Sequence, residues 1–219
     1  MSPWVARRWY DFLFWVTFYG FTFGHSLRVI GRRNVPKSGP LLVVCNHQSF
    51  FDPVLVGLAV RRYLDYLARD SLFKNRYFAA MIRSVGGLKI DRNFGKEGLQ
   101  ATLDLLDRGR AVLVFPEGER THDGEMESFK AGISLLIKRV EAPIVPVGLA
   151  GAYCAWSRYK KLPSFAPLFL AAKPATIALS VGKPIDPATL KGLSREAMLE
   201  KLHQAVEVEF AKAKRLKRK

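Results

Sequence analysis

The sequence predicts an α/β fold, with a mainly parallel, mixed sheet that helices flank on both faces. Two observations predict it. Apolar runs of strand length alternate along the chain with segments in which apolar residues recur at helical spacing, a pattern typical of parallel sheets with crossover helices. The chain has 219 residues, of which 49% are hydrophobic, and this is enough for one sizeable α/β domain.

The expected strands are short apolar runs, several of them rich in β-branched residues. We expect strands at 41–45, 64–68, 88–90, 111–115, 144–149 and 177–181. The helices between them follow from apolar periodicity and from residues that start or stop a helix. We expect helices at 53–60, 71–83, 99–108, 129–140 and from 195 onwards.

Capping residues define several of these helix ends. Ser71 and Ser194 are expected N-caps, because a serine hydroxyl accepts a hydrogen bond from a backbone N–H of the first turn. Gly86 and Gly87 end one helix, and Gly109 ends the next, because glycine readily adopts the left-handed conformation that closes a helix.

Residues 1–30 are rich in aromatic side chains, and we expect them to form a helical segment associated with a membrane. Between Asp11 and Arg28 lie 16 residues without Lys, Arg, Asp or Glu. As a helix they would span roughly 24 Å, less than the roughly 30 Å of the hydrocarbon core. Aromatic rings prefer the membrane interface, which favours an interfacial or half-inserted anchor. The alternative is a helix packed on the domain's own core.

Residues 31–219 are expected to form a single α/β domain that ends in a basic helix. Lys212 to Lys219 include six basic residues and no acid, which suits either a solvated helix end or a contact with lipid headgroups. The irregular segment 153–175 contains three prolines and several aromatic residues. It suits a lid, a second membrane-contacting loop or a hairpin, and the sequence leaves these alternatives open.

The formal net charge of +16 at pH 7 predicts attraction to polyanions: nucleic acid, anionic lipid or a phosphorylated substrate. We expect no nucleic-acid partner, because the sequence contains no recognised nucleic-acid-binding motif. The two cysteines predict free thiols in a reducing compartment, and hence the cytoplasmic face of a membrane, with peripheral or monotopic attachment. The four histidines lack metal-ligand spacing, so no metal site is expected.

His47 and Asp52 carry the first chemical signal, because they directly follow the strand expected at 41–45. At a turn from strand to helix, the Asp52 carboxylate is close enough to bond one ring nitrogen of His47, which raises the basicity of the other nitrogen. Such a pair suits removal of a proton from a substrate hydroxyl. The alternative is that Asp52 simply caps the helix before Pro53.

A second signal follows the strand expected at 111–115, in a loop that carries Glu117, Gly118 and Arg120. The planar guanidinium of Arg120 suits a phosphate, and the Glu117 carboxylate suits a polyol hydroxyl. Arg92, which follows another expected strand, is a further candidate phosphate ligand. The alternative for each arginine is a surface ion pair.

Four ordered motifs resemble those of the glycerolipid acyltransferases, the family of 1-acyl-glycerol-3-phosphate (lysophosphatidate) acyltransferases. NHQSFFD resembles the first motif, GLKIDR the second, FPEGER the third and APIVPV the fourth. The resemblance covers roughly residues 29–149. Glu119 stands where the family more often has Thr, which leaves the acceptor headgroup open.

The resemblance implies direct acyl transfer from acyl-CoA or an acyl carrier protein to the free hydroxyl of 1-acyl-glycerol-3-phosphate, giving phosphatidate. It implies that His47 is the general base and that Asp52 orients its ring. No cofactor is expected beyond the thioester co-substrate. The implied partners are a lysophospholipid acceptor, the thioester donor and a membrane surface with anionic lipids.

The resemblance also implies which residues bind the acceptor. Arg120 and Arg92 would hold its phosphate, with Arg69, just after a strand, as a weaker candidate. Glu117 would position the glycerol from the loop that contains Gly118.

The sequence is also compatible with other functions. An acyltransferase of the same fold would act on glycerol-3-phosphate, another lysophospholipid or a lyso amino-acid lipid. A basic nucleic-acid-binding protein would need no catalytic pair at all. A membrane-binding protein that has lost catalysis would have no need of the intact His47–Asp52 spacing, which argues against that alternative.

Overall fold

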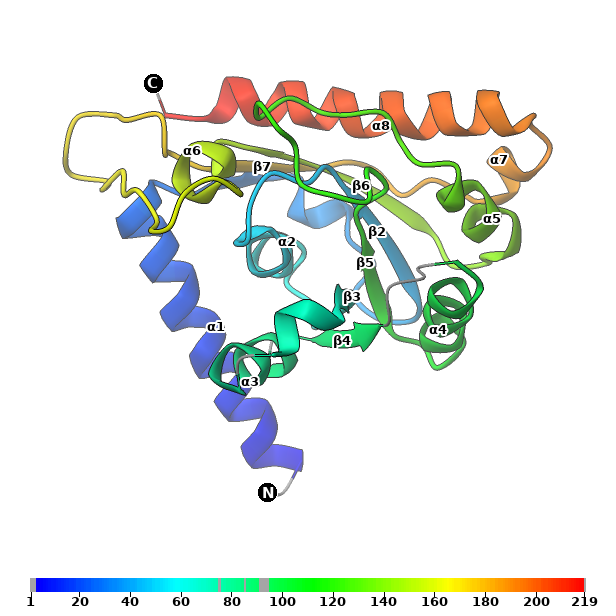
Figure 1. Cartoon of the computed structure of the whole chain (residues 1–219), viewed down its shortest axis with the longest axis horizontal. Helices are drawn as coiled ribbons and strands as arrows, with labels where there is room; N and C mark the ends of the chain where they lie inside the picture. The colour runs from blue at the N-terminus through cyan, green and yellow to red at the C-terminus, as the bar shows by residue number, and fades with distance from the viewer. Residues whose placement is uncertain (1–2, 75, 85, 91–94, 219) are drawn as a thin grey trace.

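The computed structural model describes residues 3–74, 76–84, 86–90 and 95–218. Within them, seven strands form one sheet in the order β1-β7-β6-β2-β5-β3-β4 (Figure 1). The strands are β1 (Arg28–Ile30), β2 (Leu41–Cys45), β3 (Leu64–Arg69), β4 (Gly87–Ile90), β5 (Ala111–Val114), β6 (Ile144–Ala150) and β7 (Ala178–Val181). The helices are α1 (Pro3–His25), α2 (Asp52–Val60), α3 (Arg76–Ser84), α4 (Lys96–Asp107), α5 (Gly132–Arg139), α6 (Ala152–Trp156), α7 (Ala188–Lys191) and α8 (Arg195–Leu216). The short 3-10 turns are η1 (Arg32–Asn34) and η2 (Asp70–Phe73).

Five neighbouring strands, β6, β2, β5, β3 and β4, run in the same direction. The sheet is mixed because β7 is antiparallel to β6, and β1 is parallel to β7. The predicted mainly parallel, mixed sheet is therefore confirmed. The carboxyl ends of the five parallel strands meet at one edge, which is where open α/β sheets place their sites.

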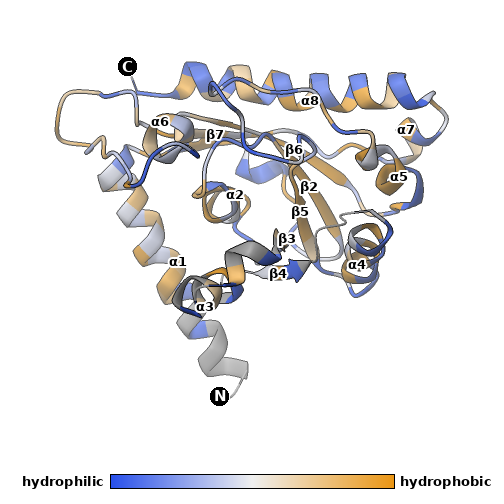
Figure 2. Cartoon of the chain, in the orientation of Figure 1, coloured by the Kyte–Doolittle hydropathy of each residue, from blue (hydrophilic) through white to orange (hydrophobic). Residues whose placement is uncertain are grey.

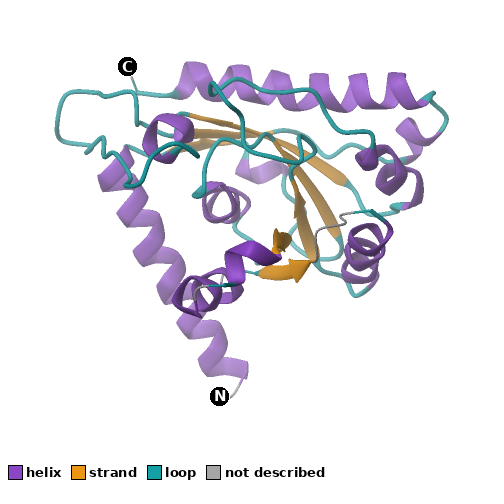
Figure 3. Ribbon diagram, viewed as in Figure 1, coloured by secondary structure: helices purple, strands orange, loops and turns teal. Residues whose placement is uncertain are grey.

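Helices cover both faces of this sheet, as predicted (Figure 3). The central strand β2 alternates between two cores: Leu41, Val43 and Cys45 pack on the side of α2 and α6, and Leu42 and Val44 pack on the side of α4, α5 and α8. All five residues of β2 are buried, as expected for a strand covered on both faces. Figure 2 accordingly shows the central strands as largely hydrophobic.

The helix expected at 71–83 is instead divided into η2 and α3. η2 begins at Asp70, directly after the last residue of β3, so no loop precedes it. Ser71 therefore lies inside a tight 3-10 turn and not at the N-cap of a long helix. By contrast, Ser194 caps α8 as predicted, and its hydroxyl oxygen accepts the N–H of Ala197 at 3.2 Å.

The helix expected at 129–140 begins only at Gly132, as α5. The N–H of Lys130 bonds to the carbonyl of Pro116 at 2.8 Å, so this part of the backbone is tied to the loop after β5. The short elements β1, α6 and α7 were not predicted, because three to five residues are too few to display a periodicity.

α1 presents apolar side chains on two adjacent faces of the helix. Phe14 and Phe18 pack against the core on the α2 side of the sheet. Trp15, Tyr19 and Phe23 form an exposed stripe on the other face. Packing on the domain's own core therefore occurs on one face only. In the part of the chain that the structure describes, no helix has the length and apolar character that a membrane crossing needs.

The sheet begins before residue 31, because β1 pairs with β7 from Arg28 onwards. The chain passes directly from α1 into this edge strand. The division into a membrane segment at 1–30 and a catalytic domain at 31–219 stays a prediction.

Candidate active site

His47 and Asp52 lie at the carboxyl edge of the sheet, on the turn between β2 and α2. His47 is the second residue after β2, and Asp52 is the first residue of α2. His47 Nδ1 is 2.7 Å from Asp52 Oδ2, and the Asp52 side chain is fully buried. The contact that the spacing predicted is therefore present.

The Asp52 carboxylate also closes the turn itself. Its Oδ2 atom accepts the backbone N–H of Ser49 at 2.7 Å and the backbone N–H of Gln48. The two interpretations of Asp52, a cap for the backbone and a partner for His47, thus both apply. Because the carboxylate accepts at Nδ1, the imidazole proton belongs on that atom, and Nε2 keeps the lone pair that a base requires.

The His47 ring is fixed from the side of β5 as well. The Phe115 ring stacks on it, with centroids 3.9 Å apart and an interplanar angle of 12°. The carbonyl of His47 accepts the N–H of Thr121 at 2.8 Å. The loop after β5 therefore holds both the ring and the backbone of His47.

Glu117 lies behind His47 and is buried. Its Oε1 atom accepts the backbone N–H of His47 at 3.1 Å. Burial raises the pKa of Glu117 to about 8, although the N–H of His47 acts in the opposite direction. The structure thus places this carboxyl against the backbone of His47, and its role toward a glycerol stays a prediction.

The turn after β5 brings Arg120 to the first motif. Gly118 has φ +76, the left-handed conformation that glycine adopts without strain, and its N–H bonds to the carbonyl of Phe115 at 3.1 Å. The Arg120 guanidinium carbon lies 3.5 Å from the centroid of the Phe50 ring. Phe50 belongs to the turn between His47 and Asp52, so Arg120 is close to that turn.

Glu119, the departure from the family pattern, has a local partner that the sequence did not indicate. Its Oε2 atom is 3.1 Å from Arg158 Nη1, which also donates to the carbonyl of Arg120 at 2.9 Å. The hydrogen bond from Arg158 lowers the pKa of Glu119, so this carboxyl stays ionised. Arg158 follows α6, in the irregular segment, and no motif marked it.

Two further side chains join distant segments around the dyad. The Asn46 amide accepts the N–H of Leu149 at 2.8 Å and donates to the Leu149 carbonyl at 2.9 Å, which ties the end of β2 to β6. The Gln48 amide donates to the carbonyl of Gly124 and accepts from the N–H of Tyr153 at 3.4 Å. The signal in the sequence is their polar character directly after a buried strand.

The remaining predicted phosphate ligands are Arg69 and Arg92. Arg69 is the last residue of β3 and therefore lies at the same carboxyl edge of the sheet. Arg92 lies outside the described residues. In the described ranges, no group of three or more His, Cys, Asp or Glu residues is arranged to hold a metal ion.

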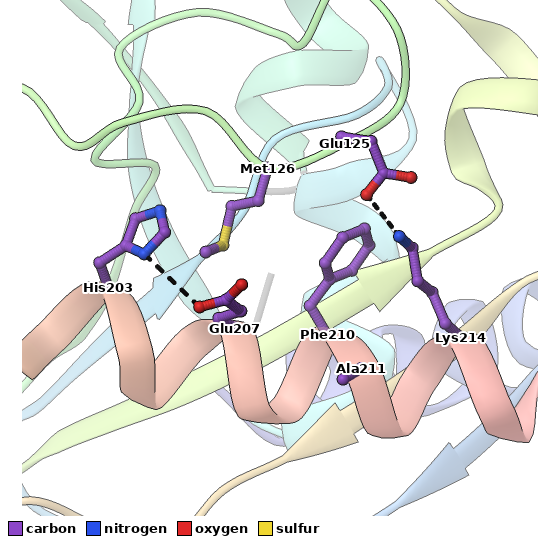
Figure 4. A pocket seen from close by; sticks show the side chains of 7 residues that line it. All are labelled: Glu125, Met126, His203, Glu207, Phe210, Ala211 and Lys214. Atoms are coloured by element: carbon purple, nitrogen blue, oxygen red, sulfur yellow. Dashed lines mark hydrogen bonds and ion pairs between the residues drawn. The ribbon is translucent and has the colours of Figure 1, made fainter.

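A small pocket lies away from the dyad, between α8 and the loop at Glu125 and Met126 (Figure 4). His203 and Glu207 approach to 4.0 Å in it, and Glu125 pairs with Lys214. Each of its two glutamates therefore lies beside a side chain of α8, and we assign no substrate to the pocket.

Comparison with known proteins assigns the chain to a family. The model of the Acyltransferase family matches residues 26–150, more than half of the chain, and the chain belongs to this family. The chain is 31% identical over 131 residues to the 1-acyl-sn-glycerol-3-phosphate acyltransferase of Chlamydomonas reinhardtii, which covers 58% of this chain and 39% of that protein. It is 30% identical over 146 residues to the human enzyme named 1-acyl-sn-glycerol-3-phosphate acyltransferase alpha, covering 63% of this chain and 51% of that protein.

A solved structure agrees with these relatives. The crystal structure of the 1-acyl-sn-glycerophosphate (LPA) acyltransferase PlsC from Thermotoga maritima superimposes with a TM-score of 0.67 at 28% identity, covering 87% of this chain and 71% of that chain. The predicted family and fold are thereby confirmed. The match to the Chlamydomonas protein spans about two fifths of that protein's length.

Proposed function

We propose that the protein is an O-acyltransferase that moves a fatty acyl group from a thioester to the free hydroxyl of 1-acyl-glycerol-3-phosphate, giving phosphatidate. The observation that carries this proposal is the 2.7 Å contact between His47 Nδ1 and Asp52 Oδ2 at the carboxyl edge of the sheet. The names of the relatives support the choice of acceptor.

In the proposed reaction, His47 Nε2 takes the proton of the acceptor hydroxyl as its oxygen attacks the thioester carbonyl. The ester C–O bond forms and the C–S bond breaks. The imidazolium then returns the proton to the leaving thiolate. Asp52 stabilises the imidazolium and keeps Nε2 pointed away from itself, so the pair needs no nucleophile of its own.

The acceptor phosphate is proposed to bind Arg120, with Arg92 as a further ligand and Arg69, at the end of β3, as a weaker one. A guanidinium matches the geometry of phosphate oxygens and stays charged at all relevant pH values. Glu119 does not oppose this site with a free negative charge, because Arg158 neutralises it. Gly118 shapes the turn that carries Arg120, and Glu117 supports the same site from beneath His47.

The proposed donor is acyl-CoA or an acyl carrier protein, and the thioester serves as an activated co-substrate without a further cofactor. The protein is proposed to work at the cytoplasmic face of a membrane as a peripheral or monotopic protein. The exposed aromatic stripe of α1 and the net charge of +16 suit a surface that contains anionic lipids. No nucleic-acid partner is proposed.

The test is lipid mass spectrometry of the products that the purified protein makes from both thioester donors and a mixture of acceptors. The mixture contains lysophosphatidate, glycerol-3-phosphate and other lysophospholipids. We expect phosphatidate as the main product of the wild type and its loss in His47→Ala, with an unchanged circular dichroism spectrum. Product from another acceptor alone would overturn the acceptor assignment, and turnover by His47→Ala would overturn the role of the base.

A further inference from the structure

The segment after α6 exposes large apolar side chains to an unusual degree. In the loop at 162–170, Leu162 is 78% exposed and Phe169 is 82% exposed, and Phe165 and Leu170 are exposed by more than half. Single exposed apolar residues are common on protein surfaces, but a contiguous group of them marks an interaction site.

The loop at 162–170 is held against the end of α1 by backbone hydrogen bonds. The N–H groups of Ala166 and Leu168 donate to the carbonyls of Gly24 and Phe23, each at 2.9 Å. The hydroxyl of Ser26 donates to the Ala166 carbonyl at 3.0 Å. The last carbonyls of a helix lack partners within the helix, and the loop satisfies two of those of α1.

The basic C-terminal tail holds the same loop from the other side. The Arg218 guanidinium donates to the carbonyls of Pro167 at 3.2 Å and Leu168 at 2.6 Å, and also to the carbonyl of Leu170. Arg218 is therefore a brace for the loop. The exposure of Phe169 and Leu170 is a fixed property of the fold, because the backbone that carries them is bonded on both sides.

The loop continues the exposed stripe of α1. The Phe169 ring stacks on Phe23, with centroids 5.8 Å apart, and Phe23 stacks on Tyr19 at 6.1 Å. Figure 1 shows the loop beside the C-terminal end of α1. We call this surface the apolar edge, and define it by Tyr19, Phe23, Leu162, Phe165, Phe169 and Leu170.

The apolar edge is connected to the dyad by aromatic contacts. Phe165 stacks on His25 at 5.3 Å, and His25 meets the Phe51 ring at 5.7 Å. Phe51 directly precedes Asp52 and also contacts Trp156 at 5.0 Å. A lipid chain lying on the apolar edge would therefore be close to the turn that carries the dyad.

The charge around the loop favours an anionic partner. Residues 158–173 include four cations and no acidic residue; Arg158 pairs with Glu119, and the other three are Lys160, Lys161 and Lys173. Lys161 and Lys173 are exposed at the two ends of the loop. Aromatic and aliphatic side chains flanked by cations are the composition of surfaces that enter the headgroup region of anionic membranes.

We propose that the loop at 162–170 is a second membrane contact, which docks with α1 onto an anionic phospholipid surface. This rests on the proposed function, because the surface would present the acceptor to the dyad from the lipid side. Two contacts fix the tilt of the domain on the membrane, whereas a single helix would leave it free to rotate about that helix. Arg218 holds the second contact in place together with the backbone bonds from α1.

The test measures binding of the full chain to vesicles of phosphatidylcholine and phosphatidylglycerol by flotation. We expect Phe169→Ser with Leu170→Ser to weaken binding by at least about tenfold, since each side chain loses its transfer from water. Val208→Ser is the matched control, because Val208 is 52% exposed on α8, and its binding should equal that of the wild type. Equal binding by the double variant, or an equal loss in the control, would overturn the proposal.

The brace is tested with a pair of variants that remove the same charge. Arg218→Gln should weaken vesicle binding more than Arg215→Gln, because it removes the bonds from Arg218 to three carbonyls of the loop. Equal effects would overturn the role of Arg218.

If Phe169→Ser with Leu170→Ser changes the sedimentation of the protein but not its vesicle binding, the apolar edge binds a second copy of the chain, and the lipid assignment is wrong.

A separate assay distinguishes this proposal from the proposed function. With lysophosphatidate dispersed in detergent, Phe169→Ser with Leu170→Ser should turn over the acceptor at the wild-type rate. With the acceptor in vesicles, the same double variant should lose this turnover. Absence of turnover in the wild type under both conditions would overturn the proposed function, and the flotation result would still decide the membrane contact. If the double variant also loses turnover in detergent, the apolar edge does more than bind the membrane, and the proposal is wrong.

Discussion

His47 is held by contacts from two different strand ends. Asp52 fixes one ring nitrogen, Phe115 covers one face of the ring, and Glu117 and Thr121 bond the backbone on either side. A proton-transfer group that is held in this way needs little reorganisation before reaction. The position of Nε2 is therefore a product of the β2 and β5 loops together.

The buried carboxyl of Glu117 predicts a pH dependence of stability. Its folded-state pKa is raised from 4.5 to about 8 by burial. Between pH 4.5 and about 8 the unfolded chain loses this proton and the folded protein keeps it. The free energy of unfolding therefore falls as pH rises through this range. The total loss, reached above about pH 8, is at most roughly 5 kcal/mol. Glu117→Gln should remove this loss. The unfolding free energy of the variant, relative to that of the wild type, should therefore increase as pH rises.

Urea unfolding across this pH range measures the effect, with Glu200→Gln, an exposed position on α8, as the control. The control should follow the wild type at every pH. A constant difference between Glu117→Gln and the wild type would contradict the raised pKa.

Arg158 predicts a second effect at the scale of single residues. Arg158→Gln removes the donor to Glu119 and to the Arg120 carbonyl, which frees a negative charge beside the proposed phosphate site. The KM for the acceptor should rise by about twofold to fivefold with a smaller change in kcat, because a partly exposed ion pair contributes about 1 kcal/mol or less. Steady-state kinetics checks this, with Arg108→Gln, remote in the sequence and exposed, as the control.

If Arg158 acts through Glu119, the additional change Glu119→Gln should restore part of the KM. A double variant as impaired as the sum of the two single variants would contradict this coupling.

The dyad could be predicted from sequence because His47 and Asp52 are five residues apart and separated by one turn. Arg158 could not, because it meets the Arg120 carbonyl from 38 positions further along the chain. A sequence pattern records local spacing, whereas this contact depends on how the segment after α6 returns to the loop after β5. The same is true of Asn46, whose partner Leu149 is 103 positions away.

At the scale of elements, α8 approaches β6 more closely than side chains normally permit. A Cβ atom on Gly148 would lie 2.0 Å from the backbone nitrogen of Phe210 in α8. Gly148→Ala should therefore push the two elements apart and cost roughly 3 kcal/mol of unfolding free energy. Urea denaturation measures the loss.

Gly192→Ala provides the matched control for this change. No atom lies within 4 Å of a Cβ added at Gly192, and its φ is −79. Its unfolding free energy should change by less than about 0.5 kcal/mol. A loss of similar size in both variants would show that the contact between α8 and β6 is not the cause.

The elements with repeated apolar spacing, such as α4 and α8, could be predicted, whereas the exact start of α5 could not. The N–H of Lys130 has a partner in Pro116, and no local propensity reports a bond to another loop. The edge strand β1 was missed for a related reason, since only one of its three residues is even partly buried. A strand of three residues is too short to display a detectable alternation.

At the scale of the whole molecule, the parallel part of the sheet followed from the alternation of strands and helices. The reversed direction of β7 did not, because it depends on the path of the long segment between β6 and β7. That segment contains the loop at 162–170, so the part of the topology that sequence did not predict is also the part that builds the apolar edge.

The charge of the whole molecule predicts how membrane binding responds to salt. With a net charge of +16, attraction to phosphatidylglycerol vesicles should weaken as the ionic strength rises from about 0.1 M to about 1 M, where the Debye length falls from about 10 Å to about 3 Å. A residual fraction should stay bound, because burial of the apolar edge does not depend on screening. Flotation at increasing salt checks this, and complete release would show that apolar contacts contribute nothing.

The attachment of α1 to β1 has a mechanical consequence. The chain leaves α1 at His25 and enters β1 at Arg28, where it pairs in parallel with β7 through Arg28, Val29 and Ile30. A pulling force on α1 along the strand therefore loads the hydrogen bonds of this edge in shear, so that they must fail together and not one after another. The edge strand acts as a tether between α1 and the sheet, and single-molecule pulling on α1 would meet its resistance at β1 before the strands that carry the dyad are disturbed.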